Sequence, residues 1–159
     1  MQAPNWLAAL ESSAFAEWMR GAGNAYAMVN LAHLLGLTLL LGAMLLLDLR
    51  LLGFGRRLPL PEVSRLLTPL AIAGLALQAC SGFALFSADA VPLSSNAAFR
   101  LKLLLIVAAL ANAVLFRVLW SRSLAGWDRA PPLAGRMQAT ASLLLWLGVA
   151  AAGRLIAYT

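Results

Sequence analysis

The chain has 159 residues, of which 62% are apolar and 11% are charged, and its formal net charge at pH 7 is +6. A soluble domain has about 45–50% apolar and about 25% charged residues, so this composition excludes an ordinary soluble domain. The basic residues flank long apolar blocks instead of forming a soluble face with interleaved aromatic side chains, so the positive charge indicates membrane topology and no nucleic-acid partner.

The first predicted element is an interfacial helix over residues 1–22. Its apolar side chains recur at helical spacing, with acids and serines opposite, at Trp6, Leu7, Leu10, Ala14 and Trp18. This pattern predicts a helix that lies on the membrane surface with its tryptophans among the headgroups. The segment has no basic leader and carries two glutamates, so we do not expect a cleaved signal peptide.

Four apolar blocks follow. Because about 20 apolar residues cross the hydrocarbon core, each block predicts a transmembrane helix. The predicted spans are residues 25–47, 66–87, 99–120 and 137–158. Short connections force neighbouring spans to be antiparallel. The predicted fold is therefore all-α: an integral membrane four-helix up-down bundle with an N-terminal interfacial helix, in a single transmembrane domain over residues 1–159.

Basic residues are shared unevenly between the two ends of this bundle. Eight lie between spans one and two or between spans three and four, and four lie on the other side. Positively charged loops stay in the cytoplasm, so both termini are expected to face the periplasm of a bacterium. The predicted location is the inner (cytoplasmic) membrane, with the lipid bilayer as the first partner.

Several polar residues near or inside the spans are predicted to be structural. Cys80 is the only cysteine, so it forms no intrachain disulfide, and we expect a buried thiol. Asp48 and Arg50 end the first span near the arginines that end the third, and opposite charges there are expected to pair. Asn112, midway along the third span, is expected to form an interhelical hydrogen bond.

The only histidine, His33, lies inside the first span, about 12 Å from its outer end at 1.5 Å per residue. Asn30 precedes it by about one turn on the same helical face. The other spans also carry polar residues in this half of the bilayer: Gln78, Ser81, Lys102 and Arg154. Polar groups are costly in hydrocarbon, so these residues are expected to face the bundle interior and to converge.

The residues alone leave two interpretations open. In the first, the polar groups form a ligand or cofactor site, and neighbouring Gly and Ala residues leave room for a flat molecule. In the second, the imidazole bonds a neighbouring helix, for example at Gln78, while Lys102 and Arg154 extend to the headgroups. The small residues would then serve helix packing alone.

Three segments carry a resemblance to known families: AHLLGLTLLLGAMLLLDLRLLG, FRLKLLLIVAALANAVLF and LLLWLGVAAAGRLIAY. Together they resemble an uncharacterised family of bacterial four-helix membrane proteins of unknown function, over nearly the whole chain. More distantly, the early histidine of span one and the Leu-Lys-Leu that opens span three are similar to the membrane-bound heme-dependent protoporphyrinogen oxidase family. The same features resemble the membrane domain of copper-resistance protein D-type transporters.

The resemblance to the oxidase family implies a b-type heme near the outer leaflet. His33 would be the axial metal ligand and Lys102 its functional partner. The heme propionates would then pair with Lys102 and Arg154, while Asn30, Gln78 and Ser81 complete the cofactor site. The chain departs from that family in having no second histidine. A redox partner would be required.

Two other functions remain open. The likeness to copper-resistance proteins implies a transporter or metal-handling protein, but Met28 and Met44 lie about 24 Å apart along one helix and form no soft-metal pair. A structural subunit, or a homo-oligomer packed through small residues, is the third hypothesis. No phosphate-binding loop, metalloprotease motif or serine-nucleophile arrangement is present, so the sequence supports no phosphoryl transfer, proteolysis or acyl transfer.

Overall fold

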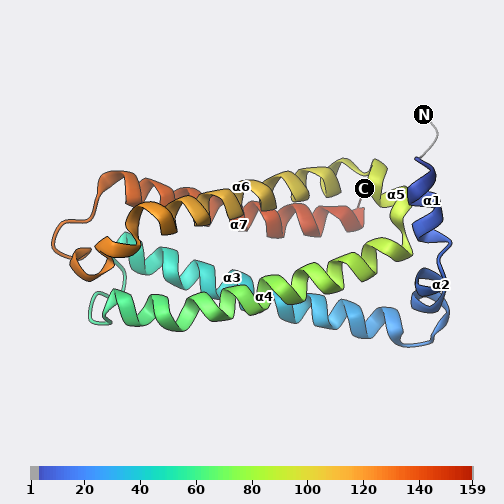
Figure 1. The fold of residues 1–159 in the computed structure, drawn as a ribbon, viewed down its shortest axis with the longest axis horizontal. Coiled ribbons are helices and arrows are strands. Elements are labelled where there is room, and N and C mark those ends of the chain that lie inside the picture. The colour runs from blue at the N-terminus through green and yellow to red at the C-terminus, as the bar shows by residue number, and fades with distance from the viewer. Residues whose placement is uncertain (1–3, 159) are drawn as a thin grey trace.

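A computed structural model describes residues 4–158, and these residues form helices and no strand (Figure 1). The long helices are α3 (Ala25–Leu52), α4 (Leu60–Ala88), α6 (Ala97–Trp120) and α7 (Leu133–Leu155). The short helices are α1 (Asn5–Glu11), α2 (Ala14–Gly21), α5 (Ala90–Ser95), η1 (Ser121–Gly126) and η2 (Ile156–Tyr158). The predicted all-α class is confirmed.

The long helices run up and down in two pairs. Helix α3 packs along α4, α6 packs along α7, and α3 also contacts α7. The described chain begins and ends at the same end of the bundle, beside α1, α2 and α5, and this end is called the terminal end below (Figure 1). The opposite end carries the connections 53–59 and 121–132 and is called the loop end.

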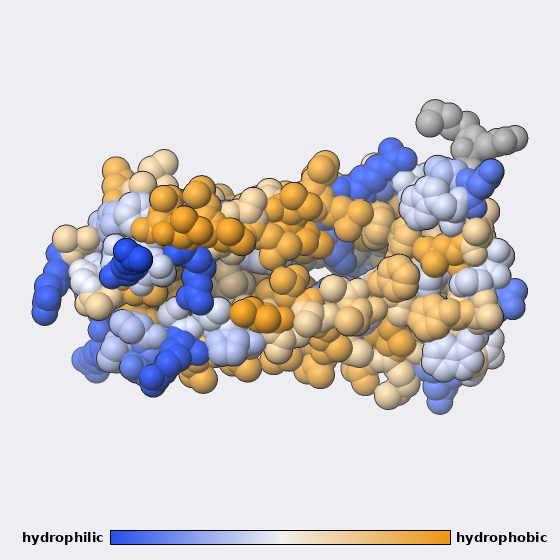
Figure 2. All heavy atoms as spheres, in the orientation of Figure 1, coloured by the Kyte–Doolittle hydropathy of each residue, from blue (hydrophilic) through white to orange (hydrophobic). Residues whose placement is uncertain are grey.

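All four long helices are long and apolar enough to cross a membrane. Large apolar side chains are exposed along them, and hydrophilic residues gather at the two ends (Figure 2). An apolar band of this kind suits hydrocarbon, where helices satisfy their own backbone hydrogen bonds. The chain is therefore a multi-pass membrane protein.

The second and fourth spans begin earlier than the apolar pattern predicted, at Leu60 and Leu133. Pro59 and Pro132 precede these two helices as N-cap residues. The first turns that follow are polar, so hydrophobicity did not reveal them, although they are helical.

The predicted interfacial helix is divided into two helices, and its first three residues lie outside the described range. Ser13 separates α1 from α2, because its side chain accepts a hydrogen bond from the backbone N–H of Ala16 and so caps α2. The face that these helices bury matches the predicted apolar face only in part. Leu7 of the predicted face is buried, together with Ala16 and Met19, whereas Trp6 and Trp18 are more than half exposed.

The two short helices are bonded to the terminal end of the bundle. Arg20 donates to the backbone carbonyl oxygens of Glu11 (2.8 Å) and Ala88 (2.7 Å), near the ends of α1 and α4. The Glu11 carboxylate accepts from the backbone N–H of Val91 in α5 (2.7 Å). Because backbone groups at helix ends lack intrahelical partners, these bonds satisfy them and hold four helices together.

The backbones of α3 and α4 come very close near the middle of the bundle. A Cβ atom added to Gly74 would lie 2.5 Å from the backbone nitrogen of Leu40, and one added to Gly36 would lie 3.1 Å from that of Gln78. Only glycine fits at Gly74. Small residues at a helix crossing permit this approach within a membrane.

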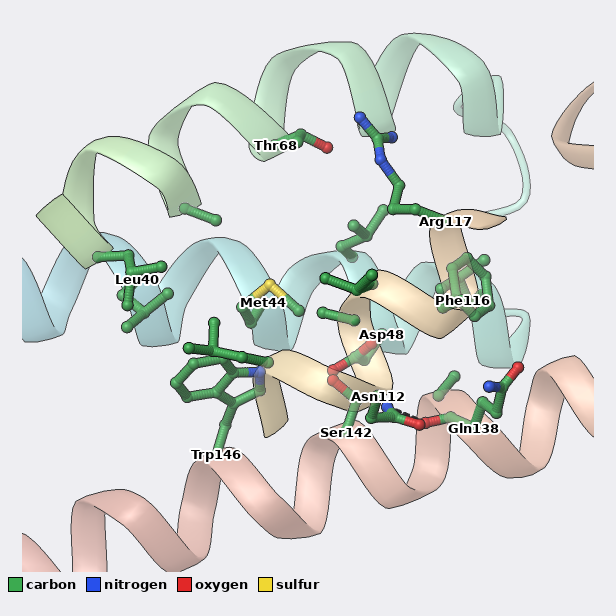
Figure 3. A pocket seen from close by; sticks show the side chains of 18 of the residues that line it. Leu40, Met44, Asp48, Thr68, Asn112, Phe116, Arg117, Gln138, Ser142 and Trp146 are labelled. Atoms are coloured by element: carbon green, nitrogen blue, oxygen red, sulfur yellow. Dashed lines mark hydrogen bonds between the residues drawn. The ribbon is translucent and has the colours of Figure 1, made fainter. Parts of the chain in front are cut away.

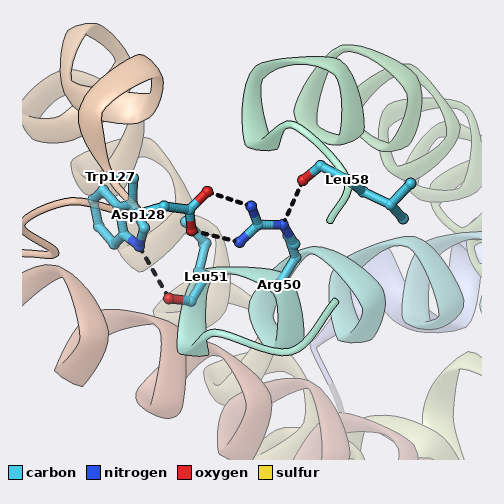
Figure 4. A network of polar contacts seen from close by, with 5 residues as sticks. All are labelled: Arg50, Leu51, Leu58, Trp127 and Asp128. Atoms are coloured by element: carbon cyan, nitrogen blue, oxygen red, sulfur yellow. Dashed lines mark hydrogen bonds and ion pairs between the residues drawn. The ribbon is translucent and has the colours of Figure 1, made fainter. Parts of the chain in front are cut away.

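At the loop end, a buried arginine joins three parts of the chain (Figure 4). Arg50 makes a bidentate ion pair with Asp128 and donates through Nε to the Leu58 carbonyl (2.9 Å). The buried Trp127 indole donates to the Leu51 carbonyl (3.0 Å). The connection between α6 and α7 is thereby fastened to the end of α3.

These contacts test three of the structural predictions. Asn112 donates to a backbone carbonyl of α7 (3.1 Å), as predicted. The expected pairing of Asp48 with an arginine is wrong, because Arg50 turns to the aspartate of the loop instead. Cys80 is exposed, not buried, because α4 packs on α3 through the face that carries Gly74 and Ser81.

The α3–α4 contact gives a first prediction. Gly74→Ala should destabilise the protein by about 1–3 kcal/mol, because the methyl group forces the two backbones apart. Gly42→Ala on α3 is the matched control, since a Cβ there meets nothing within 4 Å, and helix propensity predicts a gain of about 0.5–1 kcal/mol. Unfolding of the purified protein in detergent measures both. Equal effects of the two substitutions would contradict the close approach.

The loop-end ion pair gives a second prediction. The hydrogen bond from Arg50 holds the pKa of Asp128 below its usual value. The stabilisation is thus present above the unfolded pKa of about 3.9 and is lost as the pH falls through the lower folded pKa.

Asp128→Asn should cost about 1–3 kcal/mol at pH 7, less than for a fully buried pair, because Asp128 is 41% exposed. The difference from the wild type should shrink towards pH 2. Thermal unfolding at several pH values measures it. Glu62→Gln removes the exposed ion pair with Arg65 and should change little. A deficit in Asp128→Asn that does not depend on pH would contradict the role of the carboxylate.

Candidate functional site

The predicted site centres on His33, which α3 presents to α4 in the half of the bundle nearer the terminal end. The imidazole Nδ1 lies 2.9 Å from the hydroxyl oxygen of Ser81, a buried residue on α4. The sequence interpretation named Gln78 as an example of an imidazole partner. The ring bonds Ser81 instead, one turn further along α4.

The bond to Ser81 decides which imidazole nitrogen carries the proton. The Ser81 hydroxyl donates its single hydrogen to the Leu77 carbonyl at 2.5 Å. Its oxygen must therefore accept from His33, which places the proton on Nδ1. The neutral ring then has an unprotonated Nε2 with a free lone pair, and no described residue donates a hydrogen bond to it.

Two further residues of α4 hold His33 in place. The side-chain amide of Gln78 donates a hydrogen bond to the backbone carbonyl oxygen of His33 (2.6 Å). A Cβ atom at Gly82 would lie 3.2 Å from Cε1 of the imidazole, so glycine leaves the ring the space it occupies. The close approach of α3 and α4 thus positions the histidine from both its backbone and its side chain.

Lys102, the only lysine in the chain, joins this region from α6. Its side chain is half-buried and packs on Gly153 of α7, where a Cβ atom would lie 3.5 Å from Nζ. Figure 2 shows a narrow gap between the two helix pairs in this half of the molecule.

Arg154 and Asn30 are not drawn into the same cluster. Arg154 is exposed, donates to the Tyr158 hydroxyl and lies 4.9 Å from the centre of that ring. Asn30 is exposed on α3. Of the six predicted site residues, hydrogen bonds therefore join His33, Gln78 and Ser81. Lys102 adds a nearby cation.

The structure also bears on metal binding. Within residues 4–158, no three His, Cys, Asp or Glu side chains lie together as a metal site. Met28 is exposed, and Met44 lines a cavity in the other half of the bundle.

Sequence reasoning missed a second group of polar residues, in the half nearer the loop end. Asp48, Ser142 and Trp146 are all buried and line one cavity. Asp48 was assigned to an ion pair, and the other two were not considered. An acid directly after a predicted span was the available signal, because α3 continues to Leu52 and acids within a membrane helix are rare unless they are paired or functional.

Residues 9–159 match one protein family, described as "Family of unknown function (DUF6644)". The chain belongs to this family. The predicted membership of an uncharacterised membrane family is confirmed. No curated protein and no solved structure matches the chain.

The hydrogen-bond network around His33 gives a third prediction. Because the chain has one histidine, selective 15N labelling yields a single imidazole. In protein free of heme at neutral pH, Nδ1 should be protonated and Nε2 should not. Ser81→Ala should abolish this preference, and Thr38→Ala, which removes a hydroxyl bonded only within α3, should preserve it. A proton on Nε2 in the wild type would contradict the assignment.

Proposed function

We propose that this membrane protein binds a b-type heme, with Nε2 of His33 as an axial ligand to the iron. The observation that carries the proposal is the free lone pair on Nε2, which follows from the bonds of Ser81. Histidines that ligate metals usually donate their other ring N–H to an oxygen, and this second bond fixes the tautomer and the ring orientation. The imidazole of His33 has such a second bond, from Nδ1 to the hydroxyl oxygen of Ser81.

The surrounding residues fit the other needs of a heme. Porphyrin faces require apolar walls, which the spans provide, and the two propionates are anions that require cations. Lys102 is half-buried and packs against Gly153 of α7 inside the bundle, so it is the better partner for a propionate. Arg154 is engaged by Tyr158 at the bundle end, so we give it a smaller role.

Each residue of the site then has a separate task. His33 binds the iron, Ser81 orients the imidazole, Gln78 fixes the backbone beneath it, and Lys102 supplies the positive charge. The heme would supply one-electron redox chemistry. The partner that the proposal requires is an electron donor or acceptor.

The same proposal includes an orientation in the bacterial inner membrane. The loop end carries eight basic residues and the terminal end four. The positive-inside rule then places the loop end in the cytoplasm and both termini in the periplasm. His33 would lie in the outer half of the bilayer, within reach of a periplasmic redox partner.

The experiment is an absorption spectrum of the protein purified in detergent with heme supplied, before and after dithionite. The wild type should show a Soret band that shifts on reduction. His33→Ala should lose it, and added imidazole should restore it, because the small ligand fills the space of the missing side chain. Restoration also shows that the variant is folded.

Matched variants separate ligation from packing. Ser81→Ala should weaken heme binding about 10- to 100-fold, as expected for loss of the bond that orients the ligand. Lys102→Met should weaken it more than Lys102→Arg, because Arg retains the charge. Asn30→Ala, at an exposed position, should have no effect. A wild-type protein that takes up no heme, or a band that survives in His33→Ala, would refute the proposal.

A further inference from the structure

Within residues 4–158, three buried side-chain polar atoms have no hydrogen-bond partner, and all three belong to residues of one cavity. They are Oδ2 of Asp48, Oγ of Ser142 and Nε1 of Trp146. The three residues are only 2–3% exposed. Buried polar groups are normally bonded, and each exception costs about 1–3 kcal/mol. Three exceptions at one place indicate a site whose partner comes from outside the chain.

The cavity has a volume of about 350 Å³ and lies in the half of the bundle nearer the loop end (Figure 3). All four long helices line it. Most of the lining is apolar, with Leu40 and Met44 on α3 and Phe116 on α6. This size and lining suit a small, largely apolar molecule held by a few polar groups.

No cation of the protein neutralises Asp48. Arg50, two residues along α3, is committed to Asp128 and Leu58. Arg117 lines the cavity, but its side chain turns to α4, where it bonds Ser64 at 3.5 Å (Figure 3). Neither ion pair found in residues 4–158 includes Asp48.

The neighbouring polar side chains leave the three atoms unsatisfied as well. Ser142 lies beside Asp48 (Figure 3), but its hydroxyl and Oδ2 of Asp48 do not meet hydrogen-bond geometry with each other or with any other residue of 4–158. Asn112 donates to the backbone carbonyl of Gln138 (3.1 Å). The Gln138 side-chain oxygen accepts from the indole of Trp120 (2.6 Å). The three polar atoms at this end of the cavity are therefore available to bond a ligand.

The cavity reaches the lipid-facing surface between α4 and α6. These two helices are not among the packed pairs of long helices, although stacked rings of Phe86 and Phe99 join them near the terminal end. Ile72 on α4 and Val118 on α6 line the cavity and are also 61% and 75% exposed. An apolar molecule dissolved in the bilayer can thus enter sideways, without crossing water.

The three unsatisfied atoms restrict the polar group of such a molecule. The Asp48 carboxylate needs a donor, the Trp146 indole needs an acceptor, and the Ser142 hydroxyl can act as either. A hydroxyl is the smallest group that both donates and accepts. An ammonium cannot accept from the indole. A hydroxyl satisfies Asp48 in either protonation state, whereas a carbonyl would require a protonated Asp48. The rings of Trp146 and Phe116 favour an aromatic body.

We propose that this cavity binds a membrane-soluble phenol, the chemical class that includes quinols, with its hydroxyl at Asp48, Ser142 and Trp146. The site is separate from the heme site, because none of the six residues predicted for the heme lines it. Binding here requires no heme. The proposal therefore stands or falls independently of the proposed function.

The first experiment compares four probes by calorimetric titration of the purified protein in detergent. 4-Hexylphenol should bind saturably with one molecule per chain. 4-Hexylanisole, which accepts but cannot donate, and hexylbenzene, which does neither, should bind at least tenfold more weakly. Equal binding of the phenol and hexylbenzene would overturn the proposal, as would tighter binding of hexylammonium.

Variants then locate the binding. Asp48→Asn and Ser142→Ala should each weaken 4-hexylphenol binding about tenfold, and Thr140→Ala, at an exposed position on the same helix, should not. Without the probe, Ser142→Ala should be as stable as the wild type or more so, because it removes an unsatisfied buried hydroxyl. A structural role predicts the reverse: a less stable protein with unchanged binding.

The same titration in His33→Ala protein should reproduce the wild-type affinity for 4-hexylphenol. This result would hold even if the wild type proved unable to take up heme. Loss of phenol binding in that variant, with its helical content intact, would overturn the separation of the two sites.

Discussion

The close approach of α3 and α4 at Gly36 and Gly74 is the contact on which the His33 region depends. Because the two backbones meet there, Gln78 reaches the carbonyl of His33, and Ser81 reaches its ring, one turn further on. Helices in lipid gain little from hydrophobic association, so such proximity must come from small residues and polar bonds. A methyl group at Gly74 would move both partners of the histidine together. The packing of α3 against α4 therefore also determines the tautomer of the imidazole.

The second helix pair is fastened to the first in a different way, mainly at the ends. At the loop end, the contacts of Arg50 and Trp127 hold the connection between α6 and α7 against α3. At the terminal end, the stacked Phe86 and Phe99 rings join α4 to α6. Buried side chains of all four long helices pack in the middle of the bundle. The cavity lies beside this core, where α4 and α6 do not pack along each other.

The two sites differ in how their polar groups are satisfied. Around His33, the Ser81 hydroxyl and one N–H of Gln78 are bonded, and the open position of the imidazole is a lone pair, which suits a metal. Around Asp48, three groups lack partners, and this costs stability unless a ligand supplies the bonds. The unpartnered groups therefore lower the stability of the folded protein, as is common at binding sites. The two proposed sites thus rest on different observations: a bonded imidazole in one and unpartnered polar groups in the other.

The sequence by itself determined the class of structure, because hydrocarbon imposes long apolar helices and composition reveals them. It also identified the polar residues of the His33 region, since each interrupts an apolar run, but it overlooked Ser142 and Trp146 in the fourth span. It did not determine their partners. Ser81 lies three residues beyond Gln78, and only the helix crossing decides which of them the imidazole meets. That Arg50 pairs with Asp128, while Asp48 pairs with no arginine of the third span, was likewise decided by where the loop folds back. Such choices depend on helix rotation and on contacts between residues distant in the chain, neither of which hydrophobic periodicity encodes.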